Sequence, residues 1–131
     1  MDSVKEDIEL QVVTPNEPGI FGRVLGTLAN AGVNLKALSV TSTPTEGLFR
    51  LITSDPKKAE SALRSLSFKV KSRKVVTVMV RDRIGAGAEI GALLGNAIVD
   101  IEYSYGTSAS EGLTLLVFHT SNDKKALDTL K

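Results

Sequence analysis

A short polar loop holds the residues of this chain that are best suited to contact a small ligand. Asn16 and Glu17 are followed by Pro18 and Gly19, between a β-branched segment and the first helical stretch. Proline fixes φ, and glycine permits a sharp turn or a close backbone approach. The N–H groups that open a helix have no partner within it, and the helix dipole favours an anion there. The pattern predicts a site for a carboxylate or phosphate, although a plain tight turn would also use proline and glycine.

Asn34 is the second polar residue that we associate with this loop. It follows Asn16 by 18 residues and opens the next predicted strand, so its side chain could face the same spot. An asparagine amide donates and accepts hydrogen bonds, which suits a ligand contact. The alternative is that Asn34 only bonds its own turn after Gly32, which is a common use of asparagine.

The composition excludes most catalytic chemistry. The 131 residues include sixteen Lys and Arg, fifteen Asp and Glu, one histidine (His119) and no cysteine. These numbers exclude disulfides, thiolate chemistry and sites with several histidines. A nucleophilic triad needs a nucleophile, a base and an orienting group, and no such set is evident. We therefore expect no enzyme, catalytic residue, metal or cofactor, and we interpret His119 as a surface or sheet-edge residue.

Hydropathy and charge limit the location and the partners. No apolar run approaches the roughly 18 residues of a membrane span, so we expect no membrane partner. The first ten residues are acidic and lack a signal region, which favours the cytoplasm. The formal net charge is +1, and the basic residues between Lys69 and Arg83 lack interleaved exposed aromatics. We therefore expect no nucleic-acid partner.

The strongest pattern in the chain is an internal repeat with a shift of 66 residues. Gly19 falls on Gly85, and the segment 28–31 falls on 94–97. Apolar periodicity in each copy predicts the order strand, helix, strand, strand, helix, strand. This βαββαβ order is typical of the ferredoxin-like fold, an antiparallel sheet with both helices on one face.

The repeat predicts the elements and the division of the chain. In the first copy we expect strands at 8–14, 33–42, 48–53 and 68–71, with helices at 20–31 and 56–66. In the second copy we expect strands at 74–80, 99–106 and 113–119, with helices at 85–97 and 123–131. Repeat 1 then spans residues 1–72 and repeat 2 spans 73–131, with no linker between them. The last strand of repeat 2 is absent, so we expect the chain to continue, or a partner to complete the sheet edge.

Residues 14–24 and 28–35 resemble the ACT domain family, regulatory modules that sense small molecules, usually amino acids. The resemblance covers nearly the whole chain, twice. The segment 99–105 is similar to one in stand-alone tandem ACT proteins. The resemblance implies an α+β fold of two ferredoxin-like βαββαβ repeats packed side by side, with antiparallel sheets and helices on one face.

The resemblance also implies which residues bind a ligand. In the serine-sensing ACT module of phosphoglycerate dehydrogenase, asparagines at the positions of Asn16 and Asn34 contact the effector. Repeat 2 has Asp82 and Asp100 there, which accept hydrogen bonds, cannot donate them, and would repel a carboxylate. The residues are compatible with two inequivalent sites and with one composite site between the repeats. The implied ligand-binding residues are Asn16, Glu17, Pro18, Gly19, Ile20, Phe21, Asn34, Leu38, Asp82, Gly85 and Asp100.

We therefore expect a non-catalytic sensor that binds a free amino acid at the interface of ACT repeats. The expected partners are a second copy in a homodimer and an unidentified regulated enzyme. The alternative is a protein-interaction or dimerisation module whose ligand site has decayed. That alternative is favoured by the second copy, in which Ile84 replaces Pro18 and Ile98 replaces Gly32.

Overall fold

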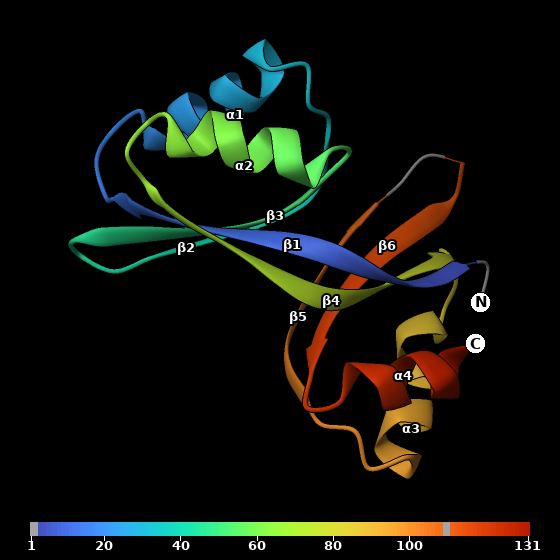
Figure 1. The fold of residues 1–131 in the computed structure, drawn as a ribbon. Helices are drawn as coiled ribbons and strands as arrows, with labels where there is room; N and C mark the ends of the chain where they lie inside the picture. Colours follow the sequence, from blue (N-terminus) through green and yellow to red (C-terminus); the bar gives the residue numbers. More distant parts are fainter. Residues whose placement is uncertain (1–2, 109–110) are drawn as a thin grey trace. The chain divides into compact units, whose positions relative to one another are not determined.

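The computed structural model describes residues 3–108 and 111–131, which form six strands and four helices (Figure 1). The strands are β1 (Ser3–Pro15), β2 (Leu35–Ser42), β3 (Glu46–Thr53), β4 (Lys69–Arg81), β5 (Ile101–Ser108) and β6 (Leu113–Thr120). The helices are α1 (Ile20–Asn30), α2 (Pro56–Arg64), α3 (Ala86–Asn96) and α4 (Asp123–Leu130). This order of elements confirms the predicted α+β fold with two ferredoxin-like repeats.

The segment Ile8–Arg73 forms one compact unit, which we call the first unit. Its strands lie in the order β2-β3-β1-β4, and α1 and α2 lie together on one face of this sheet (Figure 1). Phe49 at the centre of β3 lies opposite Val12 of β1 on one side and Val40 of β2 on the other. Both of these pairings are antiparallel, as the ferredoxin-like order requires.

The second unit consists of Lys74–Lys131 together with the segment that ends at Asp7. Its strands lie in the order β1-β4-β6-β5, so residues 3–7 of β1 provide the fourth strand that we expected to lie outside this sequence. Val4 packs against the core of this unit, and Lys74 Nζ lies 3.8 Å from Glu6 Oε1. The structure thus places residues 3–7 differently from the predicted division at residues 72 and 73.

The strand β4 serves both units without interruption. It has 13 residues, of which Val70 belongs to the core of the first unit, and Val76 and Val78 belong to the core of the second. This continuity confirms that one strand runs directly into the next, with no linker between the repeats.

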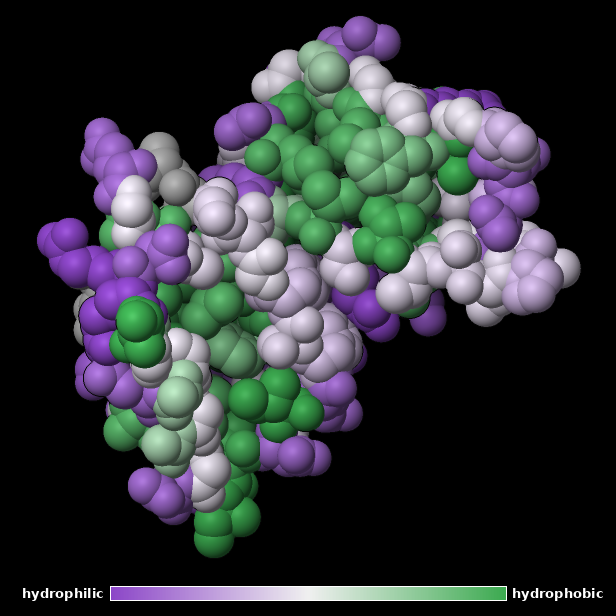
Figure 2. Space-filling view, turned by 180° about the vertical axis from the view of Figure 1, so that it is seen from behind, coloured by the Kyte–Doolittle hydropathy of each residue, from purple (hydrophilic) through white to green (hydrophobic). Residues whose placement is uncertain are grey.

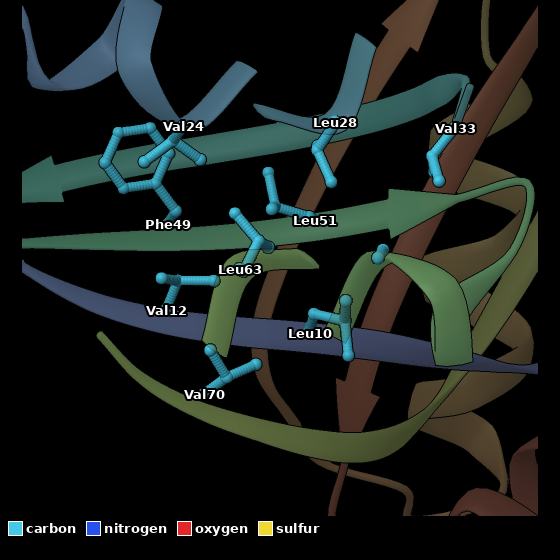
Figure 3. Close-up of a cluster of buried hydrophobic side chains, with 10 residues drawn as sticks. Leu10, Val12, Val24, Leu28, Val33, Phe49, Leu51, Leu63 and Val70 are labelled. Carbon is cyan, nitrogen blue, oxygen red and sulfur yellow. The ribbon is translucent and has the colours of Figure 1, made fainter. Parts of the chain in front are cut away.

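Each unit has a hydrophobic core of its own between sheet and helices. In the first unit, the alternate residues Leu10 and Val12 of β1 meet Val24 and Leu28, which lie four residues apart on α1 (Figure 3). Phe49 reaches the same core from β3 and is fully buried. The second core includes Val76, Val78, Val80, Ile90, Leu94 and Phe118.

The two copies repeat each other at the C-terminal ends of their first helices. Gly32 follows α1 with φ of 74°, which is the left-handed conformation that glycine adopts most easily there. Ile98 occupies the equivalent position after α3 with φ of 57°. A β-branched side chain is strained in this conformation, and 87% of the Ile98 side chain is exposed. The fold therefore gains little from this isoleucine.

We expect Ile98→Gly to raise the free energy of unfolding by about 0.5 to 1 kcal/mol. Left-handed backbone costs a non-glycine residue roughly 1–2 kcal/mol, and the greater freedom of glycine in the unfolded chain offsets part of that gain. Urea unfolding followed by circular dichroism measures the change. Ile84→Gly is the matched control, because Ile84 is fully exposed and has no positive φ. A loss of stability in Ile98→Gly would show that the side chain has a packing role.

Candidate functional site

The predicted ligand loop begins α1 with a glycine rather than with a capping side chain. Gly19 has φ of 87°, and no side chain hydrogen-bonds to the start of the helix. The N–H of Ile20 donates to the carbonyl of Glu17 at 3.3 Å, and Arg23 N–H closes the first helical turn on Gly19 O at 3.0 Å. The first turn of α1 contains no acidic residue. The N–H of Phe21, next along the helix, is thus left for an acceptor from outside the helix.

Asn16 is engaged with the turn between β2 and β3. Its side-chain Nδ2 donates to the carbonyl of Thr43 at 2.8 Å, and its backbone N–H donates to the carbonyl of Thr45 at 3.1 Å. Asn16 is nevertheless exposed, as are Glu17 and Pro18. The loop is therefore fastened at one end to the β2–β3 turn.

Asn34 lies at the other end of the same hairpin. Its N–H donates to Ser54 Oγ at 2.9 Å, and Ser54 N–H donates back to the carbonyl of Asn34 at 2.9 Å. These are backbone contacts of Asn34, and its side chain is exposed without a hydrogen bond to residues 3–108 or 111–131. The structure does not show the turn contact that we considered as an alternative role for this side chain.

Asn16 and Asn34 of one unit do not face the same spot. Asn16 contacts the turn at Thr43, whereas Asn34 pairs with Ser54, and the length of β2 separates these ends. Eight strand residues span about 26 Å, which is too far for one small molecule to contact both amides. The reason is topological: Asn34 follows α1 and so lies at its C-terminal end, while Asn16 precedes its N-terminal end.

The apolar residues predicted for the site lie on one side of the first unit. Ile20 and Leu38 are half-buried and pack against the core, while 52% of Phe21 is exposed. The ring of Phe21 lies 6.2 Å from that of Phe49, measured between centroids. In the upper part of Figure 2, hydrophobic residues form a patch on the surface of this unit. This surface could contact the apolar side chain of a ligand or a second protein.

The equivalent loop of repeat 2 has the same backbone conformation and hydrogen bonds, but it carries different charged residues. Gly85 begins α3 with φ of 88°, Asp82 N–H donates to the carbonyl of Gly112 at 2.8 Å, and Asp100 pairs with Ser121 as Asn34 pairs with Ser54. In contrast to α1, the first turn of α3 contains an acidic residue, Glu89, which forms an ion pair with Arg83. The first turn of α3 thus differs from that of α1 by a carboxylate paired with an arginine.

The single histidine of the chain is buried in the second unit. His119 is only 6% exposed, so the expectation of a surface or edge histidine is wrong: it lies on β6, which pairs with β4 on one side and β5 on the other. Its ring is 4.7 Å from that of Tyr103, between centroids. Within residues 3–108 and 111–131 no group of acidic or histidine side chains could hold a metal ion. None of the helices described is long and apolar enough to cross a membrane.

Two cavities flank the β2–β3 turn, and neither was predicted from the sequence. One has a volume of about 360 Å³ and the other of about 330 Å³. Val13 and Glu46 line both of them, and the predicted ligand-binding residues line neither. Such cavities arise from the meeting of strand ends and a turn, and no single sequence motif marks them.

Comparisons with known proteins agree with this architecture. A family model described as an ACT domain pair matches residues 7–130. A crystal structure of a Bacteroides thetaiotaomicron protein is 30% identical, with a TM-score of 0.88, and the match covers 97% of this chain and 88% of that one. No curated protein matches the sequence.

Two further solved structures are similar in fold alone. The regulatory subunit of aspartate kinase from Thermus thermophilus, in its ligand-free form, is 16% identical with a TM-score of 0.71, covering 98% of this chain and 95% of that one. The same subunit from Thermus flavus is 16% identical with a TM-score of 0.61, covering 97% and 94%.

Proposed function

Because this chain belongs to the family of ACT domain pairs, we propose that it is a non-catalytic regulatory protein that binds a free amino acid. The observation that supports this most is the start of α1. Gly19 leaves the helix N-terminus without a side-chain cap, and no acidic residue occupies the first turn. A ligand carboxylate would be stabilised there by backbone N–H groups and by the helix dipole.

We place the ligand-binding site in repeat 1 and propose that two copies of the chain form it together. Asn16 and Asn34 lie at opposite ends of one hairpin, so they reach one ligand only if each comes from a different copy. The exposed Phe21 and Val40 would be covered in such a homodimer, with Ile20 and Leu38 around the ligand side chain. A regulated enzyme would then respond to the ligand-bound pair, which requires two states of different ligand affinity.

Repeat 2 is the weaker site in this proposal. Asp82 and Asp100 would repel a ligand carboxylate, whereas asparagines occupy these positions in repeat 1. Gly85 keeps the backbone of the loop intact. We therefore expect these positions to bind an amino acid more weakly than the loop of repeat 1.

A thermal-shift series with each of the twenty L-amino acids tests the proposal. A ligand at 100 times its Kd stabilises the folded state by about 2.7 kcal/mol, which raises Tm by on the order of 5–10 °C. We expect one amino acid, or a chemically related few, to produce this shift. Asn34→Ala should reduce the shift by more than half, because it removes a hydrogen bond to a charged ligand group.

Asp100→Ala is the matched control for that variant, since Asp100 has the same backbone contacts in the second copy. It should leave the shift unchanged. If no amino acid changes Tm while the protein remains dimeric, the ligand proposal fails and the interaction module is the better description. Equal losses in both variants would mean that the ligand-binding site is not confined to repeat 1.

A further inference from the structure

We infer that Asn16 positions the ligand loop by fastening it to the β2–β3 turn, through a side-chain N–H that Asp82, at the same position of repeat 2, does not have. The structure supports the contact directly, whereas its consequence for ligand affinity rests on the proposed function. The inference changes the role assigned to Asn16, which the family resemblance implied as a ligand contact.

The hydrogen-bond partner of Asn16 determines how its amide is oriented. The acceptor is the carbonyl oxygen of Thr43, so the Nδ2 group must face it at 2.8 Å, and Oδ1 must point elsewhere. One amide N–H is thus used within the chain. What Asn16 can still offer to a ligand is its second amide N–H and the acceptor Oδ1.

The turn that receives this hydrogen bond is internally closed. Thr43 N–H donates to the carbonyl of Glu46 at 2.8 Å, and Glu46 N–H donates to Thr43 Oγ1 at 3.0 Å. Residues 43–46 therefore move together, and a bond to Thr43 holds the whole turn. The backbone bond from Asn16 to Thr45 adds a second point of attachment. Asn16 therefore links the start of α1 to the turn whose residues line both cavities.

The second repeat retains the backbone part of this arrangement. Asp82 N–H donates to the carbonyl of Gly112 at 2.8 Å, as the Asn16 backbone donates to Thr45. The ionised Asp82 side chain has no hydrogen to donate to a carbonyl, so it cannot make the side-chain bond that Asn16 makes to Thr43.

Hydrogen exchange on the ligand-free chain tests the fastening itself. We compare wild type with Asn16→Asp, which copies the residue of repeat 2, and with Asn16→Ala. Both variants should exchange faster by roughly 3- to 10-fold in residues 16–22 and 43–47, because one net hydrogen bond is lost. Asp82→Asn is the matched control and should leave these segments unchanged. Unchanged exchange in both Asn16 variants would overturn the inference.

Titrations with the twenty L-amino acids separate positioning from direct contact. If Asn16 acts through the loop, any amino acid that stabilises wild type should bind each variant more weakly, and the same variants should exchange faster. Weaker binding with unchanged exchange would make Asn16 a ligand contact and overturn the positioning role. If no amino acid binds wild type, the proposed function fails, and the exchange result alone still decides whether Asn16 fastens the loop.

Discussion

Deleting residues 1–7 should lower the free energy of unfolding of the second unit by about 3 kcal/mol, from lost hydrogen bonds and apolar burial. These residues include Val4, which packs against the second core, and a strand segment hydrogen-bonded to β4. The ion pairs of Lys5 with Asp7 and of Glu6 with Lys74 both have an N–O distance of 3.8 Å and an exposed lysine, and such pairs add little.

Tyrosine fluorescence during urea unfolding measures the stability of the second unit. The chain has no tryptophan, and both tyrosines, Tyr103 and Tyr105, lie on β5 of the second unit. A double variant, Lys5→Ser with Glu6→Ser, is the control, because it removes both ion pairs and keeps the strand. We expect the deletion to move the tyrosine transition far more than the control does. Equal transitions would show that the second unit does not depend on residues 3–7.

This dependence was not predictable from the repeat. The second copy of the repeat ends within the last helix, so the sequence predicted a fourth strand beyond Lys131 or from a partner. Residues 3–7 contain Lys5, Glu6 and Asp7 and show only one buried-type position, Val4, which makes them look like a polar leading segment. The pairing of residues 3–7 with β4, which begins at Lys69, is a non-local contact, and a single sequence taken alone has no signal for it.

Local structure was predictable at positions where a residue type favours one particular conformation or contact. Asp55 followed by Pro56 is typical of a helix start, and Asp55 Oδ1 accepts from Lys58 N–H at 3.2 Å. Glycine is typical after the C-terminal end of a helix, and Gly32 has positive φ there. Leu10 and Val12 alternate along the sequence, and both lie on the buried face of β1. These features depend only on residues that are close in the sequence, so the sequence alone is enough to predict them.

The candidate site was harder to predict than the local structure, because it depends on distances between helices and strands. The spacing of Asn16 and Asn34 suggested one shared site, yet α1 stands between them, and its 11 residues are about 16 Å long. The chain order alone shows that one residue precedes this helix and the other follows it. The use of the Asn16 amide by Thr43 has no such signal, since the partner is a backbone carbonyl 27 residues away.

Phe49→Ala should destabilise the first unit by about 3–5 kcal/mol, which is typical when a buried phenylalanine leaves a cavity. Phe49 is fully buried and lies in the middle of the sheet, opposite Val12 and Val40 (Figure 3). Hydrogen exchange of peptides from 8–73 measures the loss within this unit. A change below about 1 kcal/mol would show that the surrounding side chains can refill the space.

Phe21→Ala is the informative comparison, because the two rings are neighbours with different exposure. The Phe21 ring lies 6.2 Å from Phe49 but is half-exposed, so its removal should cost less than about 1.5 kcal/mol. If Phe21 instead serves the proposed ligand surface, Phe21→Ala should abolish the amino-acid thermal shift while the unit stays folded. A large loss of stability with an intact thermal shift would reverse these roles and make Phe21 a core residue. The pair thus separates what holds the first unit together from what it presents to a ligand.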